Sequence, residues 1–262
     1  MAYELVVIGG GNMGAALLEG MLTSGVVTAD AVAVVEPVGA RREQLADMFP
    51  GVAVVADVPD CRAAVVAVKP PDVPTVVTAA AAAGATRVLS VAAGVTTVTL
   101  QAAAGGGVAV VRTMPNTPAL VGEGVSAIAG GAGTTDADLA WAERILAGVG
   151  LVVRVSEAQL DAVTGLTGSG PAYVFLVAEA LMDAGVAAGL PRAAAEQMVT
   201  QLLVGSAKLL AERGDPAALR AMVTSPGGTT AAGVGVLEDR AVRAAFISAV
   251  RAATDRSRDL GA

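Results

Sequence analysis

The chain has 262 residues, of which 54% are hydrophobic and 2% aromatic, and its net charge is −7. This length accommodates one large domain or two smaller ones, and an acidic balance without a basic face argues against nucleic-acid binding. One cysteine, Cys61, excludes an internal disulfide, and the absence of histidine excludes His-based triads, His-ligated metals and His acid–base catalysis, so we expect no metal site.

The N-terminus does not have the pattern of a signal peptide. No basic region precedes its apolar residues, and Glu4 interrupts them, so we expect a cytoplasmic protein. The longest charge-free stretch, Val88–Val111, is broken by glycines, threonines and Gln101. We interpret it as strand, turn, short helix and strand, and expect no association with a membrane.

Short β-branched runs alternate with helix-compatible stretches in the first part of the chain. Strands are predicted at Leu5–Ile8, Ala31–Val35, Val52–Val55, Ala64–Val68, Val88–Val91, Val108–Val111, Val125–Ala129 and Leu151–Val155. Helices are predicted at Asn12–Ser24, Ala40–Phe49, Val73–Ala83, Thr96–Ala103 and Asp136–Ala147. Continuous apolar strands that alternate with helices predict a parallel sheet covered on both faces.

The strand signal stops near Ser156, and only helices are predicted beyond it. They are expected at Ala158–Leu166, Pro171–Gly189, Pro191–Arg213, Pro216–Met222, Gly228–Leu237 and Ala241–Leu260. We therefore predict two domains, an α/β domain over residues 1–156 and an all-α domain over 157–262. Several of these helices, such as the one with Tyr173–Ala178, are apolar on nearly every side, which predicts a helix-mediated homodimer.

A glycine pattern follows the first predicted strand and opens the first predicted helix. In Gly9–Gly14, the first glycine permits a tight turn, Gly11 admits a pyrophosphate to the backbone, and Gly14 lets helix and strand pack closely. The N–H groups at the helix start, around Asn12 and Met13, offer donors to phosphates. In this context the pattern predicts a Rossmann-type site for NADH or NADPH.

The residues after the second predicted strand leave the choice of dinucleotide open. Glu36 is placed to bond the ribose 2′-hydroxyl, which favours NAD. Arg41 and Arg42 follow closely and suit either a 2′-phosphate, which favours NADP, or a solvated helix face.

Further candidate cofactor residues follow later strands on the same sheet edge, since ligands bind beyond the carboxyl ends of strands in such sheets. They are Val68, Lys69, Pro70, Ala92, Ala93, Gly94 and Asn116. Asn116, between two prolines, suits either a hydrogen bond to ligand or an Asx turn.

Two glycine-rich segments mark the helical part. Gly165–Tyr173 is expected to be a helix junction, with Ser169 or Gly170 as cap and Pro171 as first helical residue, and a structural role is favoured. Thr224–Thr230 is expected to gather backbone N–H groups and hydroxyls at a helix start, with Ser225 as N-cap and Pro226 in the first turn. That arrangement suits a carboxylate ligand, although composition alone favours a plain glycine-rich turn between helices.

These motifs together resemble those of the pyrroline-5-carboxylate reductases over nearly the whole chain. The motifs are Gly9–Gly14, Ala67–Pro70, Ser90–Val95, Met114–Pro118, Asp161–Tyr173 and Ser225–Thr230 followed by Leu237 and Glu238. The resemblance implies a Rossmann domain followed by an all-α dimerisation domain, and NAD(P)H-dependent reduction of 1-pyrroline-5-carboxylate to L-proline. It also implies an active site shared across a dimer, and assembly of dimers into decamers.

The resemblance assigns the substrate to the second glycine-rich segment. It makes Ser225, Gly227, Gly228, Thr229 and Thr230 substrate-binding, with the hydroxyl of Thr230 near the ring nitrogen as the catalytic group. One segment, Gly51–Val66, is shorter than in the family and has Ala56 and Asp57 where members carry an Asn near the adenosine phosphate. Asp57 would repel a 2′-phosphate.

Three other functions are compatible with part of this pattern. A β-hydroxyacid dehydrogenase would need a lysine on an interdomain helix, but Pro171–Gly189 has none and Lys208 lacks a glycine-rich context. A reductase of another cyclic imine, such as the six-membered homologue, stays open. A non-catalytic dinucleotide sensor would keep Gly9–Gly14 without needing Ser225–Thr230.

Overall fold

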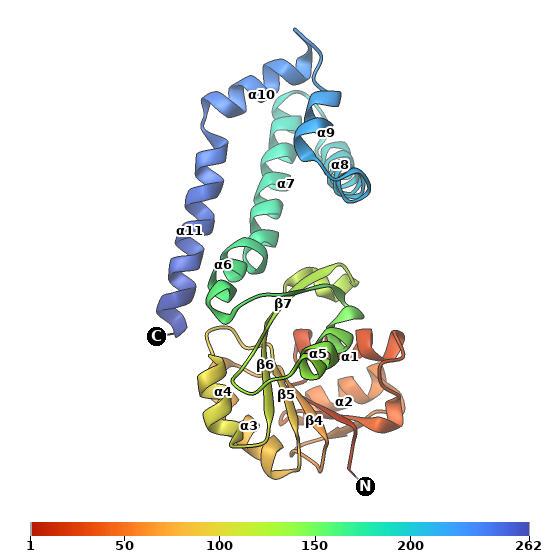
Figure 1. Ribbon diagram of the computed structural model, residues 1–262. Helices are drawn as coiled ribbons and strands as arrows, with labels where there is room; N and C mark the ends of the chain where they lie inside the picture. Colours follow the sequence, from red (N-terminus) through yellow and green to blue (C-terminus); the bar gives the residue numbers. More distant parts are fainter. Residues whose placement is uncertain (1, 262) are drawn as a thin grey trace. The chain divides into compact units, whose positions relative to one another are not determined.

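The protein, described here over residues 2–261 of a computed structural model, combines one eight-stranded sheet with helices (Figure 1). The strands are β1 Leu5–Ile8, β2 Val32–Val35, β3 Ala53–Val55, β4 Ala63–Val66, β5 Arg87–Ser90, β6 Ala109–Met114, β7 Gly124–Gly130 and β8 Gly150–Arg154. The first helices are α1 Asn12–Thr23, α2 Gly39–Met48, α3 Val73–Ala82, α4 Thr97–Ala104 and α5 Asp136–Ala147. The later ones are α6 Leu160–Val163, α7 Gly170–Ala187, α8 Arg192–Arg213, α9 Pro216–Met222, α10 Thr229–Asp239 and α11 Val242–Gly261.

The sheet is mainly parallel, in the order β3-β2-β1-β4-β5-β6-β7-β8. Our prediction of a wholly parallel sheet is wrong at one place, because β7 runs antiparallel to β6 with Met114 opposite Ala127. The cause is the connection between them, which contains only the short 3-10 turn Thr117–Val121. A parallel return requires a crossover of about a dozen residues or more.

Alternation along the buried strands divides the core between the two faces of the sheet. Leu5 and Val7 face a cluster completed by helices α1, α2 and α5, whereas Val6 and Ile8 face a cluster completed by α3 and α4. Figure 1 shows these two helix layers on opposite sides of the sheet. Because all four residues are buried, β1 is central to both layers, and the turn that follows it is held on every side.

Helix α7 does not begin at a capped junction. From Leu160 the chain turns continuously through α6, a π-turn at Thr164–Gly168 and α7, and Ser169 keeps right-handed helical angles (φ −84°, ψ −19°). The predicted cap at Ser169 or Gly170 is therefore wrong. Pro171 lies within a helical run rather than at the start of a new helix.

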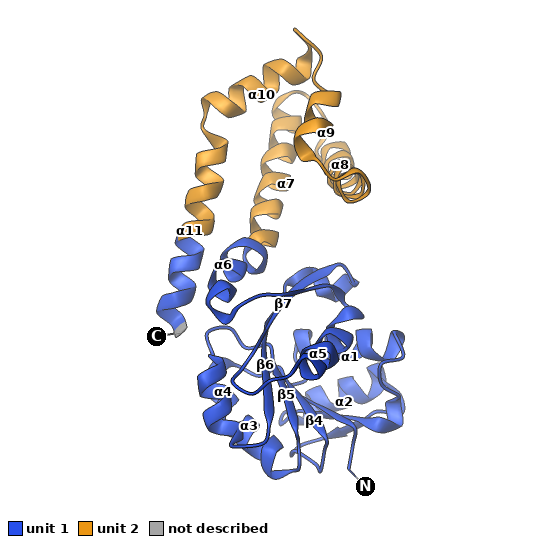
Figure 2. Cartoon of the chain, in the orientation of Figure 1, with its two compact units in different colours: residues 1–169, 252–262 blue, residues 170–251 orange. Residues whose placement is uncertain are grey.

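The described chain divides into two compact units, coloured separately in Figure 2. The first comprises residues up to Ser169 together with the end of α11 from Ala252, and the second comprises Gly170–Arg251. Within the first unit, the Ser257 hydroxyl donates to Asp161 Oδ1 at 2.8 Å, which fastens the end of α11 to α6. The strands end before residue 156, but the packing of the first unit includes α6.

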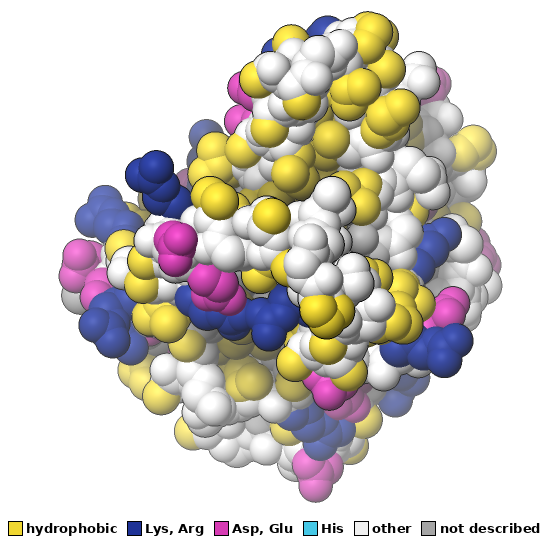
Figure 3. All heavy atoms as spheres, turned by 90° about the horizontal axis from the view of Figure 1, so that it is seen from above, with side chains coloured by type: hydrophobic (Ala, Val, Ile, Leu, Met, Phe, Trp, Pro, Cys, Tyr) yellow, Lys and Arg dark blue, Asp and Glu magenta, His cyan; other side chains and the backbone are white. Residues whose placement is uncertain are grey.

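Helix α7 exposes large apolar side chains. Phe175 and Leu176 are 62% and 65% exposed in the isolated chain. Apolar side chains are likewise frequent on the face seen in Figure 3. By length and composition alone the run Glu157–Ala187 is apolar enough to cross a membrane, and 6% of its most apolar window is buried within the chain. Such a surface requires a partner.

Candidate active site

The turn after β1 is built from glycines that the surrounding backbone requires. Gly9 has φ +107°, and a Cβ there would lie 2.5 Å from the Ala67 carbonyl oxygen at the end of β4. A Cβ on Gly14 would collide with the Gly9 carbonyl oxygen. A Cβ on Gly11, by contrast, would have no protein atom within 4 Å. Gly9 and Gly14 therefore serve packing, whereas Gly11 leaves an open approach to the backbone.

The start of α1 at this turn is ready for an anion. Gly11 is its N-cap, and no side chain of the described residues caps it. The first intrahelical bond runs from the Ala15 N–H to the Gly11 carbonyl at 2.9 Å, which leaves the N–H groups of Asn12, Met13 and Gly14 outside the helical ladder. Free donors, the helix dipole and an open Gly11 together fit a dinucleotide pyrophosphate.

Glu36 is fixed at the end of β2 beside the glycine turn. Its Oε2 accepts from the Gly10 N–H at 3.1 Å and its Oε1 from the Val38 N–H at 2.9 Å, and the residue is buried. Arg41 donates from Nε to the Gly10 carbonyl at 2.8 Å, and Arg42 donates to the Glu36 carbonyl at 2.9 Å. The carboxylate keeps spare lone pairs, while both arginines are bonded to backbone carbonyls.

The other predicted cofactor residues lie where the sequence places them, after the parallel strands β4 and β5 at the edge that carries Gly9. Lys69 is exposed and forms no ion pair with any described acidic residue. Gly94, with φ +77°, turns the chain after β5, with the buried Ala92 before it. This edge thus carries an exposed lysine that forms no ion pair within the described part of the chain.

Asn116 differs from these residues because its amide is already engaged. Its Oδ1 accepts from the Val125 N–H at 2.8 Å, and its Nδ2 donates to the Thr167 carbonyl at 3.1 Å. One N–H of the amide is left over, so its predicted role toward cofactor stays a prediction.

The second glycine-rich segment lies in the second unit, between α9 and α10. The Gly228 N–H donates to the Ser225 carbonyl at 3.0 Å, and Gly227 has φ +69°. Helix α10 begins at Thr229 with Gly228 as N-cap, so the predicted N-cap Ser225 and first-turn Pro226 are wrong. The reason is this turn, in which the Ser225 hydroxyl lies against Gly228 and excludes any side chain there.

The start of α10 has the same donor pattern as the start of α1. No described side chain caps it, and its first backbone bond runs from the Ala232 N–H to the Gly228 carbonyl at 3.2 Å. The N–H groups of Thr229, Thr230 and Ala231 therefore lie outside the helical ladder. We call this helix start, with residues Ser225–Thr230, the cradle, and its free N–H groups suit a carboxylate.

Ion pairs join helix α10, which begins at this cradle, to its neighbours α9 and α11. Glu238 of α10 contacts Arg220 of α9 at 3.6 Å and Arg243 of α11 at 2.7 Å. Hydrogen bonds from Arg243, followed by its charge and that of Arg220, lower the pKa of the Glu238 carboxyl. The network holds the ends of α9 and α10 together on the exposed surface.

One buried cluster was missed by sequence reasoning. Glu157 Oε1 accepts from the Thr97 N–H at 2.6 Å, its Oε2 accepts from the Thr97 hydroxyl at 2.5 Å, and Arg112 lies 3.3 Å from Oε1. Burial alone would raise the pKa of Glu157, but the bonds from Thr97 and Arg112 lower it overall. The sequence around Glu157 shows only an acidic residue at the start of a predicted helix. Its partners Thr97 and Arg112 are distant in sequence, so the cluster could not be found from local sequence.

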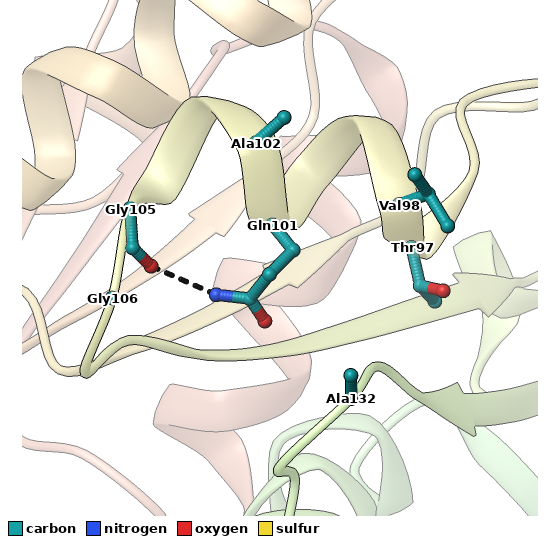
Figure 4. Close-up of a pocket in the computed structure, with 7 residues that line it drawn as sticks. All are labelled: Thr97, Val98, Gln101, Ala102, Gly105, Gly106 and Ala132. Carbon is teal, nitrogen blue, oxygen red and sulfur yellow. Dashed lines mark hydrogen bonds between the residues drawn. The ribbon is translucent and has the colours of Figure 1, made fainter.

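A separate hollow of about 490 Å³ runs along α4 (Figure 4). Gln101 Nε2 donates there to the Gly105 carbonyl at 2.8 Å, and its Oε1 is buried without a partner among the described residues. The lining residues are Thr97, Val98, Gln101, Ala102, Gly105, Gly106 and Ala132, none of which is a predicted site residue. Among the described residues no group of His, Cys, Asp or Glu has a metal-binding arrangement.

Two family models match the chain. Residues 157–260 match pyrroline-5-carboxylate reductase dimerisation, and residues 4–94 match NADP oxidoreductase, coenzyme F420-dependent. The first match lies in the predicted all-α domain, and the second contains the glycine turn.

Relatives match over the full length. A pyrroline-5-carboxylate reductase from Synechocystis sp. is 44% identical over 100% of this chain and 99% of its own length, and one from Methanosarcina acetivorans is 40% identical over 97% and 96%. The solved structure of the Coxiella burnetii enzyme has a TM-score of 0.92 at 32% identity and covers 100% of both chains. The Plasmodium falciparum pyrroline carboxylate reductase with NADP bound has a TM-score of 0.85 at 28% identity over 99% of this chain and 98% of its own. The resemblance drawn from the motifs is confirmed, and the chain belongs to the pyrroline-5-carboxylate reductase family.

Proposed function

We propose that the protein reduces 1-pyrroline-5-carboxylate to L-proline, the last step of proline biosynthesis, with NAD(P)H as hydride donor. The observation that carries this proposal is the pair of uncapped helix starts, Gly11 before α1 and Gly228 before α10. The first suits a pyrophosphate and the second a carboxylate, and the reaction requires one of each. Membership of the family supports the pairing.

The cofactor residues that we propose lie on the sheet edge of the first unit. The N–H groups of Asn12, Met13 and Gly14 bind the pyrophosphate, and Lys69 supplies a cation. The remaining members of this proposed set are Gly9, Gly11, Glu36, Arg41, Val68, Pro70, Ala92, Ala93 and Gly94. We leave Asn116 out of the set, because its amide is engaged by the Val125 N–H and the Thr167 carbonyl.

The substrate carboxylate is assigned to the cradle at α10. Backbone N–H groups of Thr229 and Thr230 bind it, and the Ser225 hydroxyl, which lies against Gly228, donates to it. Gly227 leaves open space beside it. The Thr230 hydroxyl hydrogen-bonds the ring nitrogen. A protonated imine is already electrophilic, so the residues need mainly to position it and exclude water, and histidine is not required.

The role of Thr230 is tested by substitution. Thr230→Ala is expected to lower kcat by about 10²-fold, within the range for a lost hydrogen-bonding or proton-relay group, whereas Thr230→Ser retains most activity. Thr224→Val is the matched control, since the Thr224 hydroxyl donates to the Arg220 carbonyl. Full turnover of Thr230→Ala, with loss in Ser225→Ala, would show that Thr230 has no such role.

Among the two dinucleotides we propose a preference for NADH. Glu36 holds its carboxylate at the end of β2, and Asp57 follows the neighbouring strand β3, so a 2′-phosphate would meet two acids. Arg41 and Arg42 are bonded to backbone carbonyls instead. Glu36→Gln is expected to lower the NADH-to-NADPH ratio of kcat/KM about tenfold, since like charges in contact are costly. An unchanged ratio refutes this assignment.

The assembly that we propose is a homodimer through the helical part, with dimers gathered into a decamer, in the cytoplasm. The exposed apolar face of α7 supports the dimer, and the active site then combines the sheet edge of one subunit with the cradle of its partner. Detection of L-proline by mass spectrometry after incubation with NADH and pyrroline-5-carboxylate tests the reaction. Faster turnover of the six-membered imine would favour the alternative substrate instead.

A further inference from the structure

Pro171 occupies an unusual place in the run from α6 to α7. In an α-helix the N–H of residue 171 would donate to the carbonyl of residue 167, four positions earlier. Proline has no N–H, so it leaves the Thr167 carbonyl without that donor. The π-turn at Thr164–Gly168 directly precedes it.

Other carbonyls around the π-turn are satisfied from within the helix. The Thr164 hydroxyl donates to the Leu160 carbonyl at 2.9 Å, the Thr167 hydroxyl donates to the Val163 carbonyl at 3.1 Å, and the Ser169 N–H donates to the Thr164 carbonyl at 2.8 Å. Such side-chain bonds to the preceding turn accompany bent helices.

The Thr167 carbonyl is satisfied from outside the helix by Asn116. Asn116 Nδ2 donates to this carbonyl at 3.1 Å, while Asn116 Oδ1 accepts from the Val125 N–H at 2.8 Å. Asn116 therefore joins three segments of the first unit, namely its own turn, the start of β7 and the π-turn. Beside it, Gly168 packs so closely on Met114 that a Cβ would lie 2.8 Å from the methionine methyl.

We propose that Asn116 is a positioning residue that replaces the N–H missing from Pro171 and so holds the π-turn in place at the end of the first unit. The run from α6 to α7 continues into the unit that carries the Ser225–Thr230 cradle, while the first unit carries the glycine turn. Misplacement by about 1 Å can cost 10²-fold in rate, so loss of the bond affects turnover. The turnover readout rests on the proposed reductase function.

The test is a cycle of Asn116→Ala and Pro171→Ala, singly and together. Pro171→Ala returns an N–H to the helix, so the Thr167 carbonyl no longer depends on Asn116. Pro191→Ala is the matched control, because Pro191 is the N-cap of α8 and lies beyond the end of α7 rather than within a helical run. Three quantities are measured: kcat with pyrroline-5-carboxylate, the Kd of NADH by fluorescence titration, and deuterium uptake at residues 164–170.

In the otherwise unchanged protein, Asn116→Ala is expected to lower kcat between about 10- and 100-fold and to speed deuterium uptake. The Kd of NADH stays within about twofold, because the residue acts through the helix rather than on cofactor. In the Pro171→Ala background, the fold-decrease in kcat caused by Asn116→Ala is expected to be at least threefold smaller. In the Pro191→Ala background, that fold-decrease is expected to equal the one in the otherwise unchanged protein.

Two results would overturn the proposal. One is a rise in the Kd of NADH as large as the fall in kcat, which would make Asn116 a cofactor ligand. The other is a fold-decrease in kcat on Asn116→Ala that is the same whether residue 171 is proline or alanine. If Asn116→Ala does not fold, Asn116→Ser replaces it in the same double-mutant cycle. If the wild-type protein has no turnover, the proposed function fails, while deuterium uptake and NADH titration still decide the role of Asn116.

Discussion

Gly9 and Gly11 lie two positions apart in one turn, but they are glycines for different reasons. Gly9 has a left-handed backbone and contacts the Ala67 carbonyl, so the fold requires it. Gly11 has φ −68° and open space where its Cβ would be, so the fold tolerates a side chain there. What a side chain at Gly11 would obstruct is a ligand.

Alanine substitutions separate these two roles. Gly9→Ala is expected to destabilise the protein by about 1–3 kcal/mol, because alanine is strained at that φ. Gly11→Ala is expected to leave stability unchanged or raise it by about 0.4–1 kcal/mol. It should nevertheless weaken NADH binding by about 1.5–3 kcal/mol, since hydrogen bonds to the phosphates are lost. Thermal melts and NADH titration measure both effects, and tight NADH binding by Gly11→Ala would contradict the assigned site.

The secondary structure elements were predictable where the local sequence determines them. Asp136–Ala147 begins at a capping box between Thr135 and Asp138, and Pro216–Met222 begins after Asp215, whose carboxylate caps it. Both helices have the predicted bounds. The direction of β7 follows from its short connection to β6, which contains no crossover helix. The π-turn was not predictable, because its contacts come from segments distant in sequence. The same holds for Asn116, whose partners Val125 and Thr167 become neighbours only in the folded chain.

Glu157 joins two such distant elements, the turn after β8 and the start of α4. The Thr97 and Arg112 donors keep the pKa of its carboxyl below the ordinary value of 4.5. A group whose pKa is lower in the folded state stabilises the fold above its unfolded pKa. That contribution is lost as the pH falls through the folded pKa.

Glu157→Gln is therefore expected to lower the free energy of unfolding at pH 7 by about 1–3 kcal/mol, as for lost hydrogen bonds to a charged group. The difference from the wild-type protein should shrink as the pH falls below the ordinary pKa of 4.5 and through the lowered pKa of the folded wild-type carboxyl. Urea unfolding at several pH values measures it. Glu143→Gln, in an exposed pair with Arg154, is the control with a smaller effect. A difference that is independent of pH would contradict the role of the Glu157 charge.

At the scale of the whole molecule, the apolar surface of α7 explains why the chain belongs to an assembly. Phe175→Glu is expected to shift the protein toward monomer in sedimentation and to reduce turnover, because a buried charge opposes association. Val98→Glu introduces the same charge at a side chain of α4 that is 76% exposed, and should alter neither property. Full activity from a monomeric Phe175→Glu protein would contradict a shared site.

The central claim is that one uncapped helix start holds the dinucleotide and the other holds the carboxylate of a cyclic imine. It is tested most directly by the initial rates of NADH and NADPH oxidation with pyrroline-5-carboxylate as substrate. We expect substrate-dependent oxidation of at least one dinucleotide, faster with NADH, and production of L-proline in equal amount. No oxidation with either dinucleotide would contradict it.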